Sequence, residues 1–128
     1  FINACALYCN SLINYNGSRI FFKAKLGSDD FNYIIAHEKR PFVMFYMAKW
    51  DENSKNMTWG LENIGHQYYD NVKVYGVDID ASPLCAAKHN IISIPCITLH
   101  IDGVEKTRAV GYKTEEEVLE ILRKHEVI

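Results

Sequence analysis

Residues 42–55, FVMFYMAKWDENSK, decide the fold of this 128-residue chain. The first six residues are an unbroken apolar run of strand length, which predicts a central strand covered on both faces. An acid-rich start, Asp51-Glu52-Asn53-Ser54, predicts a helix, because carboxylate and hydroxyl side chains there accept hydrogen bonds from unpaired backbone N–H groups. The predicted buried face of this helix follows at helical spacing, with Met57, Leu61, Ile64 and Tyr68.

The rest of the chain alternates strand and helix patterns around this stretch. Residues 19–26 alternate as in a half-buried strand, and a helix is predicted to begin within residues 27–30. After the central helix we expect a buried strand at 72–79, a short helix at 82–89, and strands at 97–101 and up to 110 joined by an Asp102-Gly103 turn. A capping box at 114–117 begins the final helix. The order β-α-β-α-β-α-β-β-α predicts an α/β domain with a mixed central sheet.

Residues 1–18 are predicted to be an N-terminal extension, separate from a domain at 19–128. The apolar positions of this extension share one face at helical spacing and are followed by the turn residues Asn16-Gly17-Ser18, which indicates a short helix.

Composition excludes several classes of function. The chain has 14 basic and 16 acidic residues, for a net charge of −2, and no basic stripe, which disfavours a nucleic-acid partner. No apolar run approaches the ~20 residues that a membrane-spanning helix needs.

These stretches together resemble the thioredoxin and protein disulfide isomerase family. Residues 42–55 are similar to the segment that runs, in that family, from the central strand through a tryptophan (here Trp50) into the helix of the C-x-x-C motif. Residues 77–112, VDIDASPLCAAKHNIISIPCITLHIDGVEKTRAVGY, are similar to the third helix, the cis-proline (here Ile94-Pro95), the hairpin and the glycine of the last strand (here Gly111). The resemblance covers residues 19–126 and implies a thioredoxin-like fold, a mixed sheet flanked by helices.

The resemblance also implies that the working cysteines are replaced. The nucleophilic cysteine would follow Trp50 and the resolving cysteine would lie three residues further on, at positions that hold Asp51 and Ser54. Thiol–disulfide exchange needs a thiolate and a second thiol, which a carboxylate and a hydroxyl do not supply. By the same resemblance, the family's buried acid and its lysine partner fall at Phe45 and Gly76. We therefore expect no dithiol catalysis here, and we interpret Asp51 and Glu52 as helix-capping acids.

The expected function is a redox-inactive protein-binding module, such as a chaperone-like holder, an adaptor or a subunit of a complex. The resemblance implies a shallow groove in which an extended protein segment pairs with the backbone beside the cis-proline, an interaction that needs no cysteine. The residues expected at this groove are Trp50, Asp51, Glu52, Ile94 and Pro95. The two acids would favour basic segments, and no metal or other cofactor is expected.

The four cysteines keep an enzymatic alternative open: an oxidoreductase that uses Cys96 or the pair Cys5 and Cys9. Cys85 and Cys96 are expected to be buried, inert thiols, because free cysteine is among the most buried residue types, although a disulfide between them stays open. Cys5 and Cys9 would lie one helical turn apart, with about 6 Å between Cα atoms, near the upper end of the range for a disulfide. Cys85 and Cys96 each have a histidine four residues further on, but such pairs fall short of the four ligands of a structural zinc site.

A third hypothesis is structural: residues 1–18 mediate docking while the groove is idle. Three features favour the secretory pathway (ER lumen or extracellular), with the cytoplasm as the alternative. They are the Leu84-Cys85 pair, which is similar to that of some disulfide isomerase domains, the start at Phe1 and the even number of cysteines. The chain has two glycosylation sequons, at 16–18 and 56–58, which is close to the number expected by chance. They therefore do not establish that the protein enters the secretory pathway.

Overall fold

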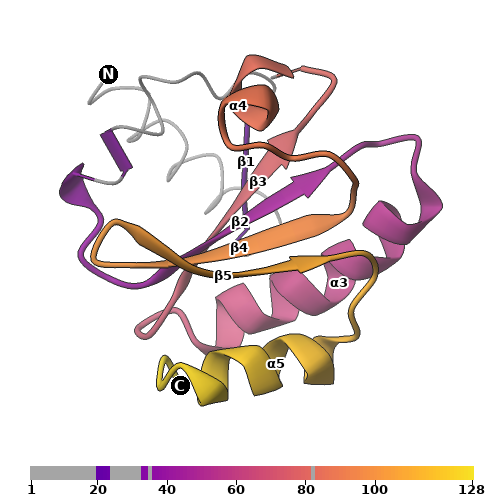
Figure 1. Ribbon diagram of the computed structural model, residues 1–128. Helices are drawn as coiled ribbons and strands as arrows, with labels where there is room; N and C mark the ends of the chain where they lie inside the picture. The colour runs from indigo at the N-terminus through magenta and orange to yellow at the C-terminus, as the bar shows by residue number, and fades with distance from the viewer. Residues whose placement is uncertain (1–19, 24–32, 35, 82) are drawn as a thin grey trace.

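A computed structural model describes residues 20–23, 33–34, 36–81 and 83–128 (Figure 1). These residues form a five-stranded sheet in the order β1-β3-β2-β4-β5. Its strands are β1 (Ile20–Lys23), β2 (Phe42–Met47), β3 (Lys73–Asp78), β4 (Cys96–Ile101) and β5 (Val104–Val110). Strands β1 and β2 both pair with β3 in parallel. Strand β4 pairs antiparallel with both β2 and β5. The predicted mixed sheet is confirmed.

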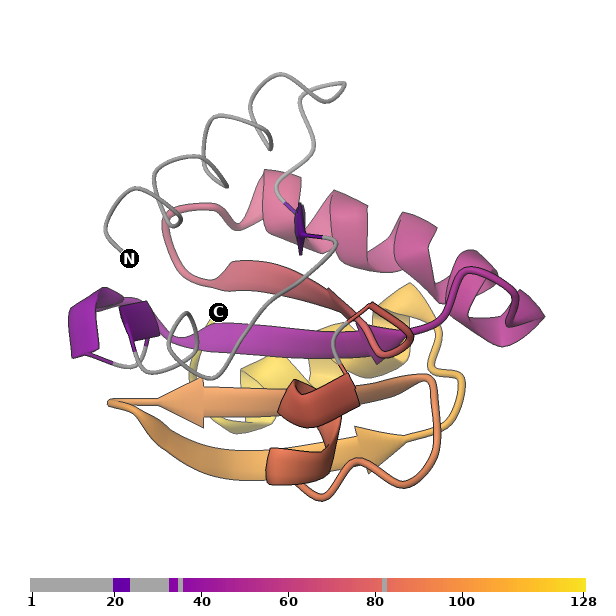
Figure 2. The ribbon, with the colours of Figure 1, turned by 90° about the horizontal axis from the view of Figure 1, so that it is seen from above.

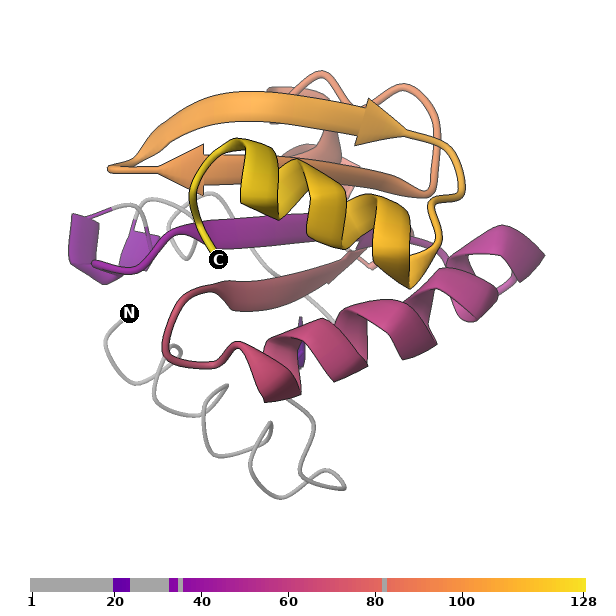
Figure 3. The ribbon, with the colours of Figure 1, turned by 90° about the horizontal axis from the view of Figure 1, so that it is seen from below.

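Helices cover both faces of this sheet. The helices α3 (Glu52–Gln67) and α5 (Glu115–Lys124) lie on one face, and the short helix α4 (Pro83–Lys88) lies on the other (Figures 2 and 3). Residues 33–34 and 36–37 are also helical and belong to the helix predicted before the central strand. The predicted extension at 1–18, with Cys5 and Cys9, lies outside the described residues. No helix in the described part of the chain has the length and apolar content to span a bilayer.

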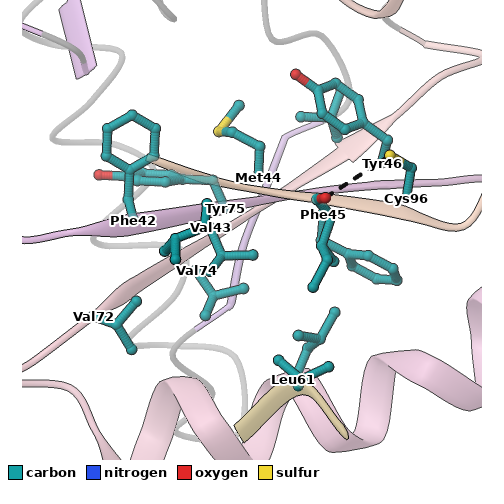
Figure 4. Close-up of a cluster of buried hydrophobic side chains, with 14 of the residues drawn as sticks. Phe42, Val43, Met44, Phe45, Tyr46, Leu61, Val72, Val74, Tyr75 and Cys96 are labelled. Carbon is teal, nitrogen blue, oxygen red and sulfur yellow. Dashed lines mark hydrogen bonds between the residues drawn. The ribbon is translucent and has the colours of Figure 1, made fainter. Parts of the chain in front are cut away.

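The core is built around β2, every residue of which is buried. Successive side chains of a strand point to opposite faces, so Phe42, Met44 and Tyr46 lie on one side of the sheet, while Val43 and Phe45 point toward α3 (Figure 4). On α3, the buried residues Met57, Leu61 and Ile64 complete that side of the core. The continuous apolar run and the helical spacing thus predicted the burial of both elements.

Strand β4 differs from its sequence pattern. The alternation at 97–101 predicts one covered face, but Thr98 and His100 are buried as well, because they lie beside Met44 and Phe42 on the face of the sheet that α4 covers. The two side chains form a hydrogen bond, with 2.8 Å between Thr98 Oγ1 and His100 Nε2. The His100 ring also stacks on Phe42, with 4.7 Å between ring centroids. Burial lowers the pKa of His100 to about 4, so this imidazole is neutral in the fold.

Two local signals in the second half of the chain are confirmed. Asp102 and Gly103 have φ values of 54° and 77°, as the tight turn between β4 and β5 requires. At the start of α5, Thr114 Oγ1 accepts the N–H of Glu117 at 3.2 Å and the Glu117 carboxylate accepts the N–H of Thr114 at 2.9 Å, which makes a complete capping box.

Candidate functional site

The predicted site residues come together because of the strand directions. The C-terminal ends of β2, β3 and β5 and the N-terminal end of β4 all lie at one end of the sheet. Trp50, Asp51 and Glu52 follow β2, and Ile94 and Pro95 precede β4. We call these five residues the candidate surface.

Asp51 is the N-cap of α3. Its backbone is extended, with φ −87° and ψ 122°, and its carboxylate accepts the N–H of Ser54 at 2.9 Å. The backbone N–H of Asp51 in turn donates to the carbonyl of Ala48 at 3.1 Å, which closes the turn between β2 and the helix. The capping role predicted for Asp51 is confirmed. Glu52 is exposed in the first helical turn, where a negative charge is favourable.

Ser54 links the helix start to the end of β2. Its side chain is fully buried, and its hydroxyl donates to the Asp51 carboxylate at 2.9 Å while accepting the N–H of Ala48 at 3.3 Å. The hydroxyl therefore has both a donor and an acceptor role inside the protein. This arrangement fixes the orientation of the Asp51 carboxylate and has no group that could act as a thiol nucleophile.

Trp50 is held at the surface by the next strand. Its side chain is 67% exposed, and its indole Nε1–H donates to Asp80 Oδ2 at 2.6 Å. Asp80 follows β3, and its backbone N–H donates to Asp78 Oδ1 at 3.0 Å. A large apolar ring is thus displayed beside carboxylates at the end of the sheet. Asp80 was not among the predicted site residues, because its partner is 30 residues away in the chain.

The segment before β4 contributes backbone as well as side chains. The Ile94–Pro95 peptide bond is cis, and the Pro95 carbonyl accepts the N–H of Gly111 at 2.8 Å. Pro95 itself is buried, so the exposed part of this segment is residue Ile92, at 94% exposure, and its neighbours. Outside the helices and strands, no backbone–backbone hydrogen bond among the described residues involves partly buried Ile94.

The two described cysteines are buried, and one of them, Cys96, directly follows Pro95 of the candidate surface. Cys85, on α4, and Cys96, the first residue of β4, are both buried, and no disulfide joins them. The Cys96 thiol lies 3.9 Å from the carbonyl oxygen of Ile97, and burial raises its pKa, which disfavours the thiolate. Across the sheet, Tyr46 pairs with Cys96, and burial raises the pKa of this phenol above its ordinary range. In the described residues, no group of three or more His, Cys, Asp or Glu side chains is arranged to hold a metal ion.

Sequence reasoning missed Arg108, which lies on β5. Its guanidinium pairs with Glu105 and also donates to the backbone carbonyls of His89 and Asn90, just after α4. The two bonds to the backbone carbonyls join residues 18 and 19 positions apart, so neither periodicity nor a local motif signals them.

Comparisons with known proteins agree on one family. The sequence profile described as Thioredoxin matches residues 22–124. A thioredoxin of Griffithsia pacifica is 28% identical over 91 residues, covering 71% of this chain and 84% of that protein. A thioredoxin of Chlamydia trachomatis is 33% identical over 81 residues, covering 63% of this chain and 78% of that protein. A solved structure from work on thiol resolution in yeast mitochondrial 1-Cys peroxiredoxin via glutathione/thioredoxin systems superposes with a TM-score of 0.70 at 24% identity, covering 78% of this chain and 92% of that one. The latter likeness supports the fold.

Proposed function

The chain belongs to the thioredoxin family, and we propose that it is a redox-inactive member that binds extended protein segments instead of exchanging disulfides. The observation that carries this proposal is the hydrogen-bonded pair of Asp51 and Ser54 at the start of α3. We assign these two residues to the positions of the C-x-x-C cysteines, since they follow Trp50 at the end of the central strand. A carboxylate that caps the helix and a buried hydroxyl cannot attack or resolve a disulfide.

A second feature of the sheet supports loss of the reaction. Phe45 and Gly76, which the resemblance places where the family keeps a buried acid and its lysine partner, lie directly opposite each other in the pairing of β2 with β3. Phe45 is completely buried in the apolar core. A proton relay between these two strands therefore has no titratable group at either position.

The candidate surface, together with the neighbouring residue Ile92, has features that binding requires. Trp50 offers an exposed aromatic anchor, Ile92 an exposed aliphatic one, and Ile94 a backbone donor and acceptor for an extended segment. Asp51, Glu52 and Asp80 bring three carboxylates to the region of Trp50 against one exposed ammonium group, that of Lys49, so basic segments are favoured over acidic ones. Such contacts carry no covalent step and give reversible binding, as a chaperone-like holder or an adaptor needs.

The test uses unfolded proteins whose cysteines are blocked. Reduced, carboxamidomethylated ribonuclease A is unfolded and basic, and α-lactalbumin treated in the same way is unfolded and acidic. Titrated into the ¹⁵N-labelled chain, the basic probe is expected to shift the resonances of the Trp50 indole and of Ile92 and Ile94, with weaker binding at higher salt. The acidic probe is expected to bind more weakly.

Substitutions locate the interface. Trp50→Ala is expected to weaken binding of the basic probe about tenfold, the effect of losing an aromatic anchor. Trp59→Ala is the matched control, because Trp59 is 72% exposed and lies in α3 about two helical turns after the N-cap Asp51. If Trp50→Ala and Asp51→Ala both leave the affinity unchanged, the candidate surface is not the interface.

One observation favours the enzymatic alternative, a thiol–disulfide oxidoreductase that uses Cys96. This cysteine directly follows the cis-proline and lies at the same end of the sheet as Trp50. Its burial and raised pKa must then be relieved by a rearrangement before it reacts. Reduction of insulin by the chain, abolished by Cys96→Ser, would establish this alternative. The Cys5 and Cys9 pair, outside the described residues, is tested by the corresponding serine substitutions.

A further inference from the structure

Arg108 makes four hydrogen bonds, of which two bind Glu105 within β5 and two tie β5 to the segment after α4. Its Nε donates to Glu105 Oε2 at 2.9 Å, and its Nη2 donates to Glu105 Oε1 at 3.0 Å. The same guanidinium donates from Nη2 to the carbonyl of His89 at 2.8 Å and from Nη1 to the carbonyl of Asn90 at 3.0 Å. The bidentate carboxylate thus holds the planar fork in the orientation in which it reaches both carbonyls.

The two carbonyls lie where the chain changes direction. The N–H groups of residues 89–91 donate to carbonyls in the last turn of α4, whereas the carbonyls that Arg108 reaches lie beyond the helix. Here α4 ends at Lys88, and Asn90 adopts a left-handed conformation with φ 57°. The chain that leaves this turn runs directly to the cis-proline. Arg108 therefore fixes the position at which the segment of residues 89–95 begins.

Strand β5 also fixes the other end of that segment. Gly111, directly after β5, donates its N–H to the carbonyl of Pro95 at 2.8 Å. Between the two attachments, Ile91 donates its N–H to the carbonyl of Ala86 at 2.9 Å, and the next residue, Ile92, is 94% exposed. One strand thus holds both ends of the segment that displays Ile92 and the backbone of Ile94.

We propose that Arg108 is a positioning residue for partner binding, which acts by holding Ile92 and Ile94 in the conformation that an extended segment meets. This inference rests on the proposed function. A segment already held in its binding conformation spares the complex the entropic cost of ordering it, and affinity rises accordingly. Lysine cannot replace arginine in this role, because a single ammonium group does not bridge a carboxylate and two carbonyls at once.

A double-mutant cycle on binding of carboxamidomethylated ribonuclease A separates positioning from general stabilisation. Arg108→Gln and Ile92→Ala are each expected to weaken binding about fivefold, and the double variant about five- to tenfold instead of about 25-fold, because the two residues act through one contact. Arg108→Lys is expected to lose most of the affinity that Arg108→Gln loses, although it keeps the charge.

Arg123→Gln is the matched control. Arg123 also pairs with two carboxylates, of Glu116 and Glu120, but it lies on α5, which packs on the face of the sheet opposite α4 (Figures 2 and 3). Its substitution removes the same charge and is expected to leave the affinity within about twofold of the native value.

The outcomes are distinct. Fold losses that multiply in the double variant, or equal affinities for Arg108→Gln and Arg123→Gln, would overturn the positioning role while leaving the proposed function intact. Absence of binding by the native chain would instead remove the proposed function, and the positioning role with it.

Discussion

Replacing Asp51 by alanine removes two hydrogen bonds at the start of α3, and the structure sets the size of the effect. The carboxylate accepts from the N–H and from the hydroxyl of Ser54, each at 2.9 Å. Loss of an N-cap costs about 1 kcal/mol, and loss of a hydrogen bond to a charged group about 1.5 kcal/mol. Because Asp51 is half-exposed and water can replace part of each bond, we expect Asp51→Ala to lower the free energy of unfolding by about 2 kcal/mol.

Urea denaturation followed by far-ultraviolet circular dichroism measures this change, as a drop in the unfolding midpoint of about 1 M at unchanged slope. Asp51→Asn keeps an acceptor oxygen and is expected to cost about half as much. In a Ser54→Ala background, Asp51→Ala is expected to cost about 1 kcal/mol less than it does alone, because one of its bonds is already gone. A neutral or stabilising Asp51→Ala would refute the reasoning, since the carboxylate would then contribute nothing to the helix start.

Three further predictions follow from burial and backbone conformation. His100 has a pKa of about 4 in the fold against an ordinary value of 6.5, so the unfolded chain takes up a proton first as pH falls from 6.5 to 4. Stability is expected to drop by up to about 3 kcal/mol over this range, and His100→Gln to remove most of that slope; an unchanged slope would exclude His100 as its source. The Cys96 thiol, buried and with a raised pKa, is expected to react with iodoacetamide at least about a hundredfold more slowly than in the unfolded chain, as mass spectrometry can follow; native labelling at the unfolded rate contradicts this. Gly111 has a φ of +93° with open space around it, so Gly111→Ala is expected to cost about 1–2 kcal/mol in urea denaturation through backbone strain alone, and a neutral substitution would contradict the assigned conformation.

The elements that sequence predicted well are those whose signals are local. The apolar run of β2, the cap at Asp51 and the capping box of Thr114 and Glu117 each need only neighbouring residues, and each is confirmed. The turn at 102–103 belongs to the same class.

The features that sequence could not predict depend on distant partners. Thr98 and His100 alternate as solvent-facing residues would, and they are buried because segments distant in the chain cover their face of the sheet. Arg108 looks like an ordinary charge on an exposed strand until the fold brings the carbonyls of His89 and Asn90 within reach.

The candidate site was predictable in part. The resemblance to a known family led to Trp50, Asp51 and Ile94, and the strand directions bring them to one end of the sheet. The burial of Pro95 and the bond between Trp50 and Asp80 did not follow from the sequence, because both depend on how separate segments pack at that end.

Reduction of insulin by dithiothreitol, followed as release of the free B chain in reversed-phase chromatography, tests most directly whether this chain exchanges disulfides, because this readout does not depend on aggregation of the product. We predict that the native chain leaves the rate at that of dithiothreitol alone, and that the double variant Asp51→Cys/Ser54→Cys accelerates it, because cysteines at these positions would restore a dithiol at the start of α3. Acceleration by the native chain would contradict the account, and its loss in Cys96→Ser would assign the activity to that thiol.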